Sequence, residues 1–425
     1  MSKEVQFRDL VLITKYFPFN MGDVPAESYL EEEVGILSDI FENVYVFAVD
    51  APADRELCQA IPRNARAFPL GIASNRGRKV RLLLSSLLPV RRQNRKYYKL
   101  VRQAEESMDS FGKLILFRYA FNKAEVYRKT IELIVEHDNL RVDGALFYSF
   151  WLFDTALSVV RLANAFDGLA MSRAHRYDLY ENQNVFGYLP FRRYLGDKLD
   201  VIAPCSKDGM KYLVFEEGYP LQKTHLSYLG TNDLGYVELS VCDVPLVVSC
   251  STLTKVKRVP LIAAAMKILD EEGFLVRWRH YGAGPEMGIV QSNINQLNII
   301  DAKLMGSFDH KDLMRVYRDD PPHLFVNVSS SEGLPISIME ACSLGTPVIC
   351  TDVGGSSEIV SEKNGALLDA NSSAREIADA IRRVLGMDAH SYRKLRVGSR
   401  LAWESKFDAS ANVRSLFSIL MERGR

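Results

Sequence analysis

Short apolar runs alternate with amphipathic segments along the whole chain, and this alternation constrains the fold more than any other feature. Apolar residues that recur every three or four positions predict helices near 26–41 and over 258–271, 310–318 and 335–344. Strands that are apolar on both faces and alternate with helices favour an α/β fold with parallel sheets covered on both sides. The runs typical of buried strands are residues 10–14, 44–49, 145–149, 199–204, 245–250, 275–280, 324–328 and 347–350.

The length of 425 residues exceeds the usual extent of one hydrophobic core, so we expect two domains. The strand series restarts near Pro245, after a turn-rich stretch that contains Gly230 and Gly235. We therefore expect an N-terminal domain over residues 1–238 and a second domain over residues 239–395. Residues 396–425 are expected to be helical.

Charge and cysteine content exclude several classes of protein. Lys and Arg together number 53, as do Asp and Glu, so the formal net charge is zero. Nucleic-acid-binding proteins usually have a basic excess, so this balance argues against that class. The six cysteines form no C-x-x-C pair, which indicates reduced thiols rather than a disulfide framework. We see neither a signal peptide nor an apolar run long enough to span a membrane, and we expect a cytoplasmic protein.

Residues 76–102 differ from the rest of the chain. They contain ten Arg or Lys residues and no acidic residue, and the apolar sequence LLLSSLLPV lies between two basic clusters. A solvated helical surface is one interpretation, and a surface that docks on anionic lipid at the inner face of a membrane is the other. Nucleic acid is a third and weaker alternative.

The sequence VNVSSSEGLPISIMEACSLGTPVICTDVGGSSEIVSEKNGA, residues 326–366, carries the densest chemical signal. A loop at the carboxyl end of a buried strand precedes a helix whose first turn contains Pro335, and open α/β sheets bind ligands at that edge. The unpaired N–H groups of such a helix start suit a phosphate or a sugar hydroxyl. Glu332 on the loop and Glu340 on the helix would both reach one ligand and accept hydrogen bonds from vicinal hydroxyls. Glycines that permit tight turns and close backbone approach are found at 345, 354, 355 and 365.

This pattern resembles glycosyltransferase family 4, whose members have the GT-B fold. The resemblance rests on E-x7-E from Glu332 to Glu340 and on the A-C-S-L-G-T-P-V-I-C-T-D-V-G-G sequence that follows. Further similar segments are HYGAGPE (280–286), VSCSTL with KRV (248–259), RAHRYDLY (173–180) and the N-terminal FPFNMG to AESYLEEE (17–33), the last as in a bacterial polysaccharide branch. The resemblance implies two Rossmann-like domains facing a central cleft, with the C-terminal helix of residues 396–425 packed back on the N-terminal domain.

The family implies a retaining glycosyltransferase that moves a sugar from a nucleoside-diphosphate sugar to a glycan or a polyprenyl-linked acceptor. At the reaction centre, Glu332 would hold the transferred sugar near its 3-hydroxyl. His175 would lie near the donor sugar, with a satisfied core histidine as the alternative for this residue. Lys257 would bind the diphosphate and stabilise its leaving charge.

The family also implies the groups that hold the donor. Glu340 would bind the ribose hydroxyls. The backbone positions implied for the diphosphate, the sugar and the nucleotide are Gly22, Gly333, Leu334, Gly282 and Gly284.

One position departs from the family pattern, because Thr252 stands where the family usually has an arginine. Arg258 would replace the missing cation on the diphosphate or would point to solvent. No D-x-D pair occurs in the chain, so we expect neither a catalytic metal nor a cofactor. The alternatives are a nucleotide-sugar epimerase or sugar phosphorylase of the same fold, a non-catalytic partner subunit, and, least favoured, a dinucleotide oxidoreductase without the G-x-G-x-x-G that would follow its first strand.

Overall fold

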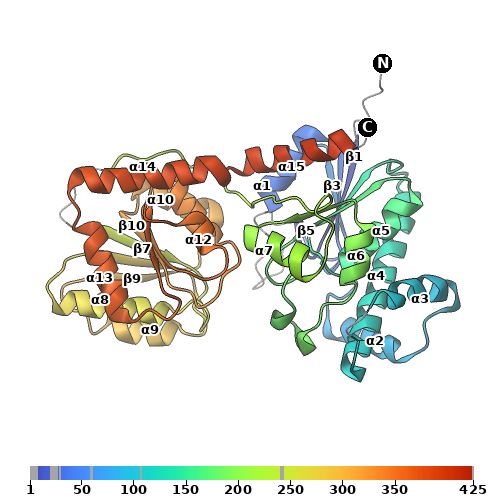
Figure 1. Cartoon of the computed structure of the whole chain (residues 1–425), viewed down its shortest axis with the longest axis horizontal. Helices are drawn as coiled ribbons and strands as arrows, with labels where there is room; N and C mark the ends of the chain where they lie inside the picture. The colour runs from blue at the N-terminus through green and yellow to red at the C-terminus, as the bar shows by residue number, and fades with distance from the viewer. Residues whose placement is uncertain are drawn as a thin grey trace, which may run out of the picture. The chain divides into compact units, whose positions relative to one another are not determined.

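A computed structural model of the chain describes residues 8–19, 27, 30–57, 61–105, 108–239 and 244–423. The chain forms two compact units, and each contains a sheet flanked by helices (Figure 1). Unit 1 consists of Met1–Ser227 and Val413–Arg425, and unit 2 of Tyr228–Asn412.

The sheet of unit 1 has six parallel strands in the order β3-β2-β1-β4-β5-β6. The chain runs outward from the central strand β1 to β3 and then returns to continue from β4 on the other side. The loops that follow β1 and β4 therefore lead to opposite faces and leave a crevice between them. The strands are β1 (Asp9–Thr14), β2 (Asn43–Ala48), β3 (Ala65–Pro69), β4 (Leu146–Ser149), β5 (Leu169–Ala174) and β6 (Val201–Pro204).

Side-chain alternation along β1 builds a core on each face of this sheet. Val11 and Ile13 pack with α4 and α5, whereas Leu10 and Leu12 pack with α1 and with residues 413–420 near the C-terminus. The helices of unit 1 are α1 (Leu30–Ile40), α2 (Arg76–Leu87), α3 (Arg95–Gln103), α4 (Phe111–His137), α5 (Asp154–Ala165), α6 (Arg192–Lys198) and α7 (Lys207–Lys211). Short helical turns are η1 (Arg92–Asn94), η2 (Glu181–Gln183), η3 (Val185–Gly187) and η4 (Tyr212–Glu216).

The sheet of unit 2 has the same connectivity, with parallel strands in the order β12-β11-β10-β7-β8-β9. Its strand order reverses between β10 and β7. The strands are β7 (Leu246–Cys250), β8 (Arg277–Tyr281), β9 (Asp301–Gly306), β10 (Leu324–Asn327), β11 (Val348–Thr351) and β12 (Gly365–Leu368). The helices are α8 (Val259–Glu271), α9 (Met287–Ile294), α10 (His310–Asp319), α11 (Ile336–Ser343), α12 (Ser356–Ile359), α13 (Ala374–Leu385), α14 (Ala389–Lys406) and α15 (Ala409–Arg423), the last of which continues into unit 1.

All eight predicted strands are present, with ends displaced by one or two residues. The predicted start of a helix near Ala26 lies outside the described residues, and α1 is described from Leu30. The sequence did not indicate β3, β5, β9 and β12. Three of these are edge strands, and β9 alternates between exposed and half-buried residues, so it lacks a continuous apolar run. The fourth, β5, buries Ser172 and Arg173 and therefore reads as polar.

The division between the units lies at residues 227 and 228, eleven residues before the expected boundary. Residues 228–238 bind the C-terminal helices of unit 2: the Thr231 amide donates to the Phe407 carbonyl at 2.9 Å, and the Trp403 indole donates to the Thr231 hydroxyl at 2.8 Å. The segment expected as 396–425 is also divided. Residues 396–406 continue α14, and Asp408 caps a second helix, α15, by accepting from the Ala411 amide at 2.9 Å.

A buried histidine lies in the sheet of unit 2. The Trp278 indole donates to the Ser249 hydroxyl at 3.0 Å, which lies 2.9 Å from His280 Nδ1, and His280 Nε2 lies 3.2 Å from the Ser251 carbonyl. All these groups are satisfied when His280 is neutral, with Nε2 as the donor. Burial lowers the pKa of His280 from 6.5 to about 4.

We predict that stability falls between pH 7 and pH 5 because of His280. The unfolded state binds a proton near pH 6.5 while the folded state stays neutral to about pH 4, so acid favours unfolding. The contribution of this group over that interval is about 2 kcal/mol. Urea unfolding of His280→Gln should show a correspondingly smaller loss, and the exposed His390→Gln should behave like wild type. Equal losses in all three proteins would contradict this assignment.

Candidate functional site

The loops after β7 and β10 meet where the strand order of unit 2 reverses, and an ion pair joins them. Lys257 Nζ lies 2.7 Å from Glu332 Oε1 and 2.9 Å from Oε2. The Glu332 side chain is 8% exposed and that of Lys257 is 26% exposed. Two residues that the sequence assigned to one site are therefore in direct contact.

A polar network fixes the Glu332 carboxylate from the strand side. The side-chain Nδ2 of Asn327, at the end of β10, donates to Glu332 Oε1 at 3.2 Å. Asn327 Oδ1 in turn accepts from the backbone amide and the hydroxyl of Ser329, at 3.1 and 2.7 Å. The Thr351 hydroxyl donates to the Ser329 carbonyl at 2.6 Å and ties this loop to the end of β11.

The Gly354–Gly355 pair packs against the loop that carries Glu332 and Gly333. Gly354 has φ +54°, and a Cβ atom there would lie 2.1 Å from the Glu332 carbonyl oxygen. The Gly355 amide donates to the Gly333 carbonyl at 2.7 Å. Glycine is therefore required at 354 both for its backbone conformation and for the close approach of the two loops.

The amides of Gly333 and Leu334 have no hydrogen-bond partner among the described residues. Both precede α11, whose first residue, Ile336, follows Pro335. Free amides at a helix start attract an anion or a hydroxyl oxygen, so these groups retain the binding capacity that the sequence predicted.

Glu340 lies on α11 and is 4% exposed. Its Oε1 is 2.7 Å from Nε2 of His310, the first residue of α10. The second carboxylate of the E-x7-E pattern is thus held by a histidine that was not predicted from the sequence.

Burial, with the nearby charge of Glu340, raises the pKa of the Cys250 thiol to about 12, so this thiol stays protonated.

Arg258 does not point to solvent, so that alternative is wrong. Its Nε donates to the Val328 carbonyl at 2.6 Å, and Nη2 donates to the Ser329 carbonyl at 3.1 Å. The residue adopts φ +49° immediately before α8. Its guanidinium therefore anchors the loop that leads to Glu332. Thr252 is exposed on the neighbouring loop.

Gly282 and Gly284 bring the loops after β7 and β8 together. A Cβ atom would lie 1.9 Å from the Ser251 carbonyl oxygen at Gly282 and 2.6 Å from the Leu253 carbonyl oxygen at Gly284. The Leu253 amide donates to the Ala283 carbonyl at 3.0 Å. Close backbone packing explains both glycines, and their contact with a nucleotide stays a prediction.

His175 lies in unit 1, after β5, and is 9% exposed. Its ring centroid is 4.5 Å from that of Phe150 and 4.8 Å from that of Trp151. Neither ring nitrogen has a hydrogen-bond partner within the part of the chain that the structure describes. Its Nδ1 lies 3.7 Å from Asp178 Oδ2, beyond hydrogen-bond distance, so the described residues do not satisfy the ring and its role near the donor sugar stays a prediction. Gly22 lies outside the described residues.

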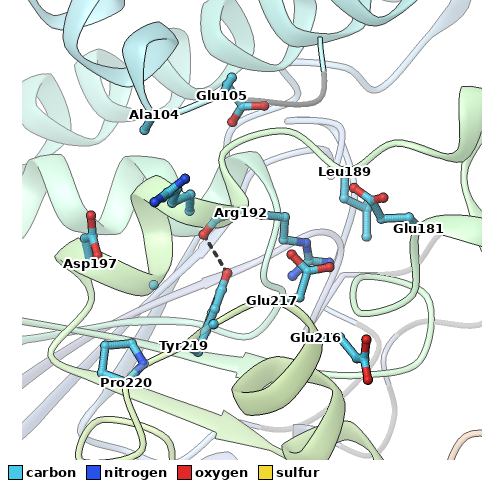
Figure 2. A pocket seen from close by; sticks show the side chains of 13 residues that line it. Ala104, Glu105, Glu181, Leu189, Arg192, Asp197, Glu216, Glu217, Tyr219 and Pro220 are labelled. Atoms are coloured by element: carbon cyan, nitrogen blue, oxygen red, sulfur yellow. Dashed lines mark hydrogen bonds between the residues drawn. The ribbon is translucent and has the colours of Figure 1, made fainter. Parts of the chain in front are cut away.

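Unit 1 also contains a cavity of about 420 Å³ away from the predicted residues. Figure 2 shows the hydrogen bond from the Tyr219 hydroxyl to the Arg192 carbonyl, 2.8 Å long, and carboxylates among the residues that line the cavity. None of the predicted site residues that the structure describes lines this cavity. Its carboxylates are Glu105, Glu181, Asp197, Glu216 and Glu217.

No cluster of three metal-binding side chains occurs within the described ranges. No helix among the same residues is both long and apolar enough to cross a bilayer.

Two hydrogen-bond partners of the predicted glutamates were not identified from the sequence. Asn327 ends a buried strand directly before the loop, a position that signals a turn or a site residue. His310 lies thirty positions before Glu340 and no local pattern marks it. The first could have been found from the sequence, and the second required the tertiary structure.

A match to a known protein family lies within the second unit. Residues 238–398 match the family model of glycosyl transferases group 1. The putative colanic acid biosynthesis glycosyltransferase WcaL of Escherichia coli is 26% identical over 255 residues, which are 58% of this chain and 62% of that protein. The putative teichuronic acid biosynthesis glycosyltransferase TuaC of Bacillus subtilis is 40% identical over 95 residues, 22% of this chain and 23% of that protein. The chain thus spans less than two thirds of these relatives.

Solved structures match the fold over nearly the whole chain. Sucrose-phosphate synthase from Thermosynechococcus elongatus superposes with a TM-score of 0.69 at 16% identity, covering 98% of both chains. The Anabaena protein HepE, crystallised with UDP-glucose, gives 0.60 at 16% identity and covers 97% of this chain and 99% of its own. These matches and the two parallel six-stranded sheets confirm the predicted α/β fold of GT-B type. The match to the family model of glycosyl transferases group 1 covers residues 238–398 and so contains Lys257, Glu332 and Glu340.

Proposed function

We propose that this protein is a glycosyltransferase that moves a sugar from a nucleoside-diphosphate sugar to a glycan or lipid-linked acceptor in cell-surface polysaccharide synthesis. The observation that carries the proposal is the Lys257–Glu332 pair beside the free amides of Gly333 and Leu334, within a group 1 domain. One positive charge, one carboxylate and two free N–H groups together suit a diphosphate joined to a sugar. The similarity to WcaL and TuaC, named for colanic acid and teichuronic acid biosynthesis, supports the choice of polysaccharide synthesis.

The two glutamates then have different roles in the bound donor. Glu340 accepts hydrogen bonds from the ribose hydroxyls, with His310 fixing its carboxylate. Glu332 accepts from the transferred sugar near its 3-hydroxyl, and Lys257 is already held beside it, ready to face the diphosphate. The Gly22 amide, the loop of Gly282 and Gly284, and the charge of Arg258 complete the proposed donor site.

Negative charge develops on the diphosphate as the sugar leaves, and stabilising it is the main requirement for catalysis. Lys257 and the amides before α11 supply fixed positive potential for that purpose. We propose front-face attack with retention, in which the leaving diphosphate takes the acceptor proton, and in which His175 lies near the donor sugar. No metal or cofactor takes part in this scheme.

The acceptor side includes docking on an anionic membrane surface through residues 76–102. On α2 the two serines face inward: Ser86 is fully buried, and the Asn122 side-chain Nδ2 donates to the Ser85 carbonyl at 3.3 Å. The exposed surface of the helix carries cations together with apolar side chains that are 46–58% exposed, namely Val80, Leu83, Leu84 and Leu87. The ten cations of the segment make no ion pair with any described residue. Exposed apolar side chains among unpaired cations fit the interface of an anionic bilayer at the cytoplasmic side.

We predict that Glu340→Gln weakens donor binding and that Glu332→Gln lowers turnover. Each variant loses a charge-assisted hydrogen bond, an effect of about 1.5–3 kcal/mol. A panel of nucleotide-sugars first identifies the donor by thermal stabilisation, since a ligand at about 100 times its Kd adds about 2.7 kcal/mol. Steady-state kinetics with that donor then test the variants, with the exposed Glu362→Gln as the control. Wild-type kinetics in both glutamate variants would refute the assignment, and product analysis separates transfer from epimerisation or phosphorolysis.

Activity should survive an excess of EDTA, because Lys257 and backbone amides replace a metal on the diphosphate. The same assay is repeated after dialysis against chelator, with magnesium or manganese added back in parallel. Complete loss of activity that either metal restores would show that the diphosphate is held in another way.

Binding to vesicles should require anionic lipid and low salt. Near such a surface each cation contributes about 1 kcal/mol, so replacing Arg91, Arg92, Arg95 and Lys96 by Ser should weaken binding about 30-fold if half of them are engaged. Co-sedimentation with anionic and neutral vesicles measures this. A control variant removes four exposed cations elsewhere by Ser substitution at Arg63, Arg318, Arg383 and Lys394. Equal pelleting with both lipids, unaffected by the substitutions, would assign the segment to an ordinary solvated surface.

A further inference from the structure

A lysine surrounded by aromatic rings lies where the strand order of unit 1 reverses. Lys15 follows β1, and its Nζ is 5.0 Å from the ring centroid of Trp151 and 4.9 Å from that of Phe153, both of which follow β4. The ring of Tyr177, which follows β5, is 5.8 Å away and its residue is 54% exposed. The loops that follow three adjacent strands thus place one cation and three aromatic rings at one edge of the sheet.

Two buried carboxylates hold the loops of this cluster in place. Glu27 accepts from the Tyr16 and Phe17 amides, at 2.9 and 3.0 Å, and from the Trp151 indole, and so joins the loops after β1 and β4. Asp178, which is fully buried, accepts from the Leu152 amide at 2.7 Å and from the His175 amide, and so joins the loops after β4 and β5. The aromatic faces are therefore fixed before any ligand arrives, which reduces the entropy lost on binding.

Both carboxylates are occupied by N–H donors, and neither pairs with Lys15. Lys15 Nζ has no ion pair or hydrogen bond with any residue that the structure describes. The corresponding position of unit 2 is different, because Lys257, after the first strand of its sheet, is neutralised by Glu332 across the reversal of strand order. In unit 1 the ammonium group of Lys15 lies beside aromatic rings and has no ion pair among the described residues.

We propose that Lys15, Trp151, Phe153 and Tyr177 form a binding site for an acidic saccharide. The ammonium group of Lys15 binds the anionic substituent, a carboxylate or a phosphate. The C–H face of the pyranose packs on the aromatic rings, which supply apolar area while the hydroxyls stay in water. That this saccharide is part of the acceptor rests on the glycosyl transfer proposed above, whereas the binding itself does not.

Trp151 supplies the readout for a test with the full-length protein. The chain has three tryptophans, of which Trp278 and Trp403 are 0% and 1% exposed and Trp151 is partly exposed. Four probes are titrated in the millimolar range at constant ionic strength: glucuronic acid, glucose 6-phosphate, glucose and inorganic phosphate. We expect saturable fluorescence changes with one or both acidic sugars, and binding of glucose and of phosphate about tenfold weaker, as for the loss of one charge-assisted hydrogen bond.

Matched variants decide whether the cluster is the site. Lys15→Met should remove the preference for acidic sugars, a loss of about tenfold, while Lys198→Met at an exposed position should not. Trp151→Phe should abolish the signal, and ligand-observed NMR then reports whether the sugar still binds. Binding of glucuronic acid alone assigns the anion as a carboxylate, and binding of glucose 6-phosphate alone assigns a phosphate. No saturable change, or equal affinities in wild type and Lys15→Met, would overturn the proposal.

Thermal stabilisation by nucleotide-sugars separates this proposal from the proposed function. Lys15→Met should respond to the donor panel as the wild type does. A wild-type protein that binds acidic sugars but no nucleotide-sugar would refute the glycosyl transfer and leave the saccharide site standing.

Discussion

The reversal of strand order in each parallel sheet decides where this protein can place polar chemistry. Within a sheet covered by helices on both faces, almost every backbone group is paired and almost every side chain is apolar. Only where successive connections leave toward opposite faces do two loop ends separate and leave N–H groups and charged side chains open to a ligand. In unit 2 this point lies between β10 and β7, and Lys257 and Glu332 occupy it.

The rigidity of the unit 2 site comes from backbone contacts more than from side chains. Gly354, Gly282 and Gly284 stand where any Cβ atom would collide with a neighbouring carbonyl oxygen, so the loops pack more closely than other residues would permit. Arg258 adds hydrogen bonds from its guanidinium to two loop carbonyls. The candidate catalytic groups are consequently held by close backbone packing and by loop hydrogen bonds, which is how preorganised electrostatic sites are built.

The two units use the same topology with opposite electrostatic results. In unit 2 a lysine and a carboxylate form an ion pair. In unit 1 the carboxylates of Glu27 and Asp178 hold loops, and Lys15 lies against aromatic rings with no ion pair among the described residues. Both units place a lysine after the first strand of the sheet, and the residues that surround each lysine differ.

The sequence by itself determined the fold class, eight of the twelve strands and the Glu332–Glu340 pair, because buried parallel strands and E-x7-E on a strand–loop–helix are local patterns. It did not indicate the edge strands β3, β9 and β12, which are buried on fewer sides and need no continuous apolar run, or the inner strand β5, which buries polar residues. The sequence also did not indicate that the units divide at residues 227 and 228. Residues 228–238 belong to unit 2 through contacts with Trp403 and Phe407, more than 150 positions away along the chain. His310 beside Glu340, the carbonyl contacts of Arg258 and the aromatic surroundings of Lys15 were decided by the tertiary structure alone, since each joins segments whose proximity depends on strand order rather than on spacing along the chain.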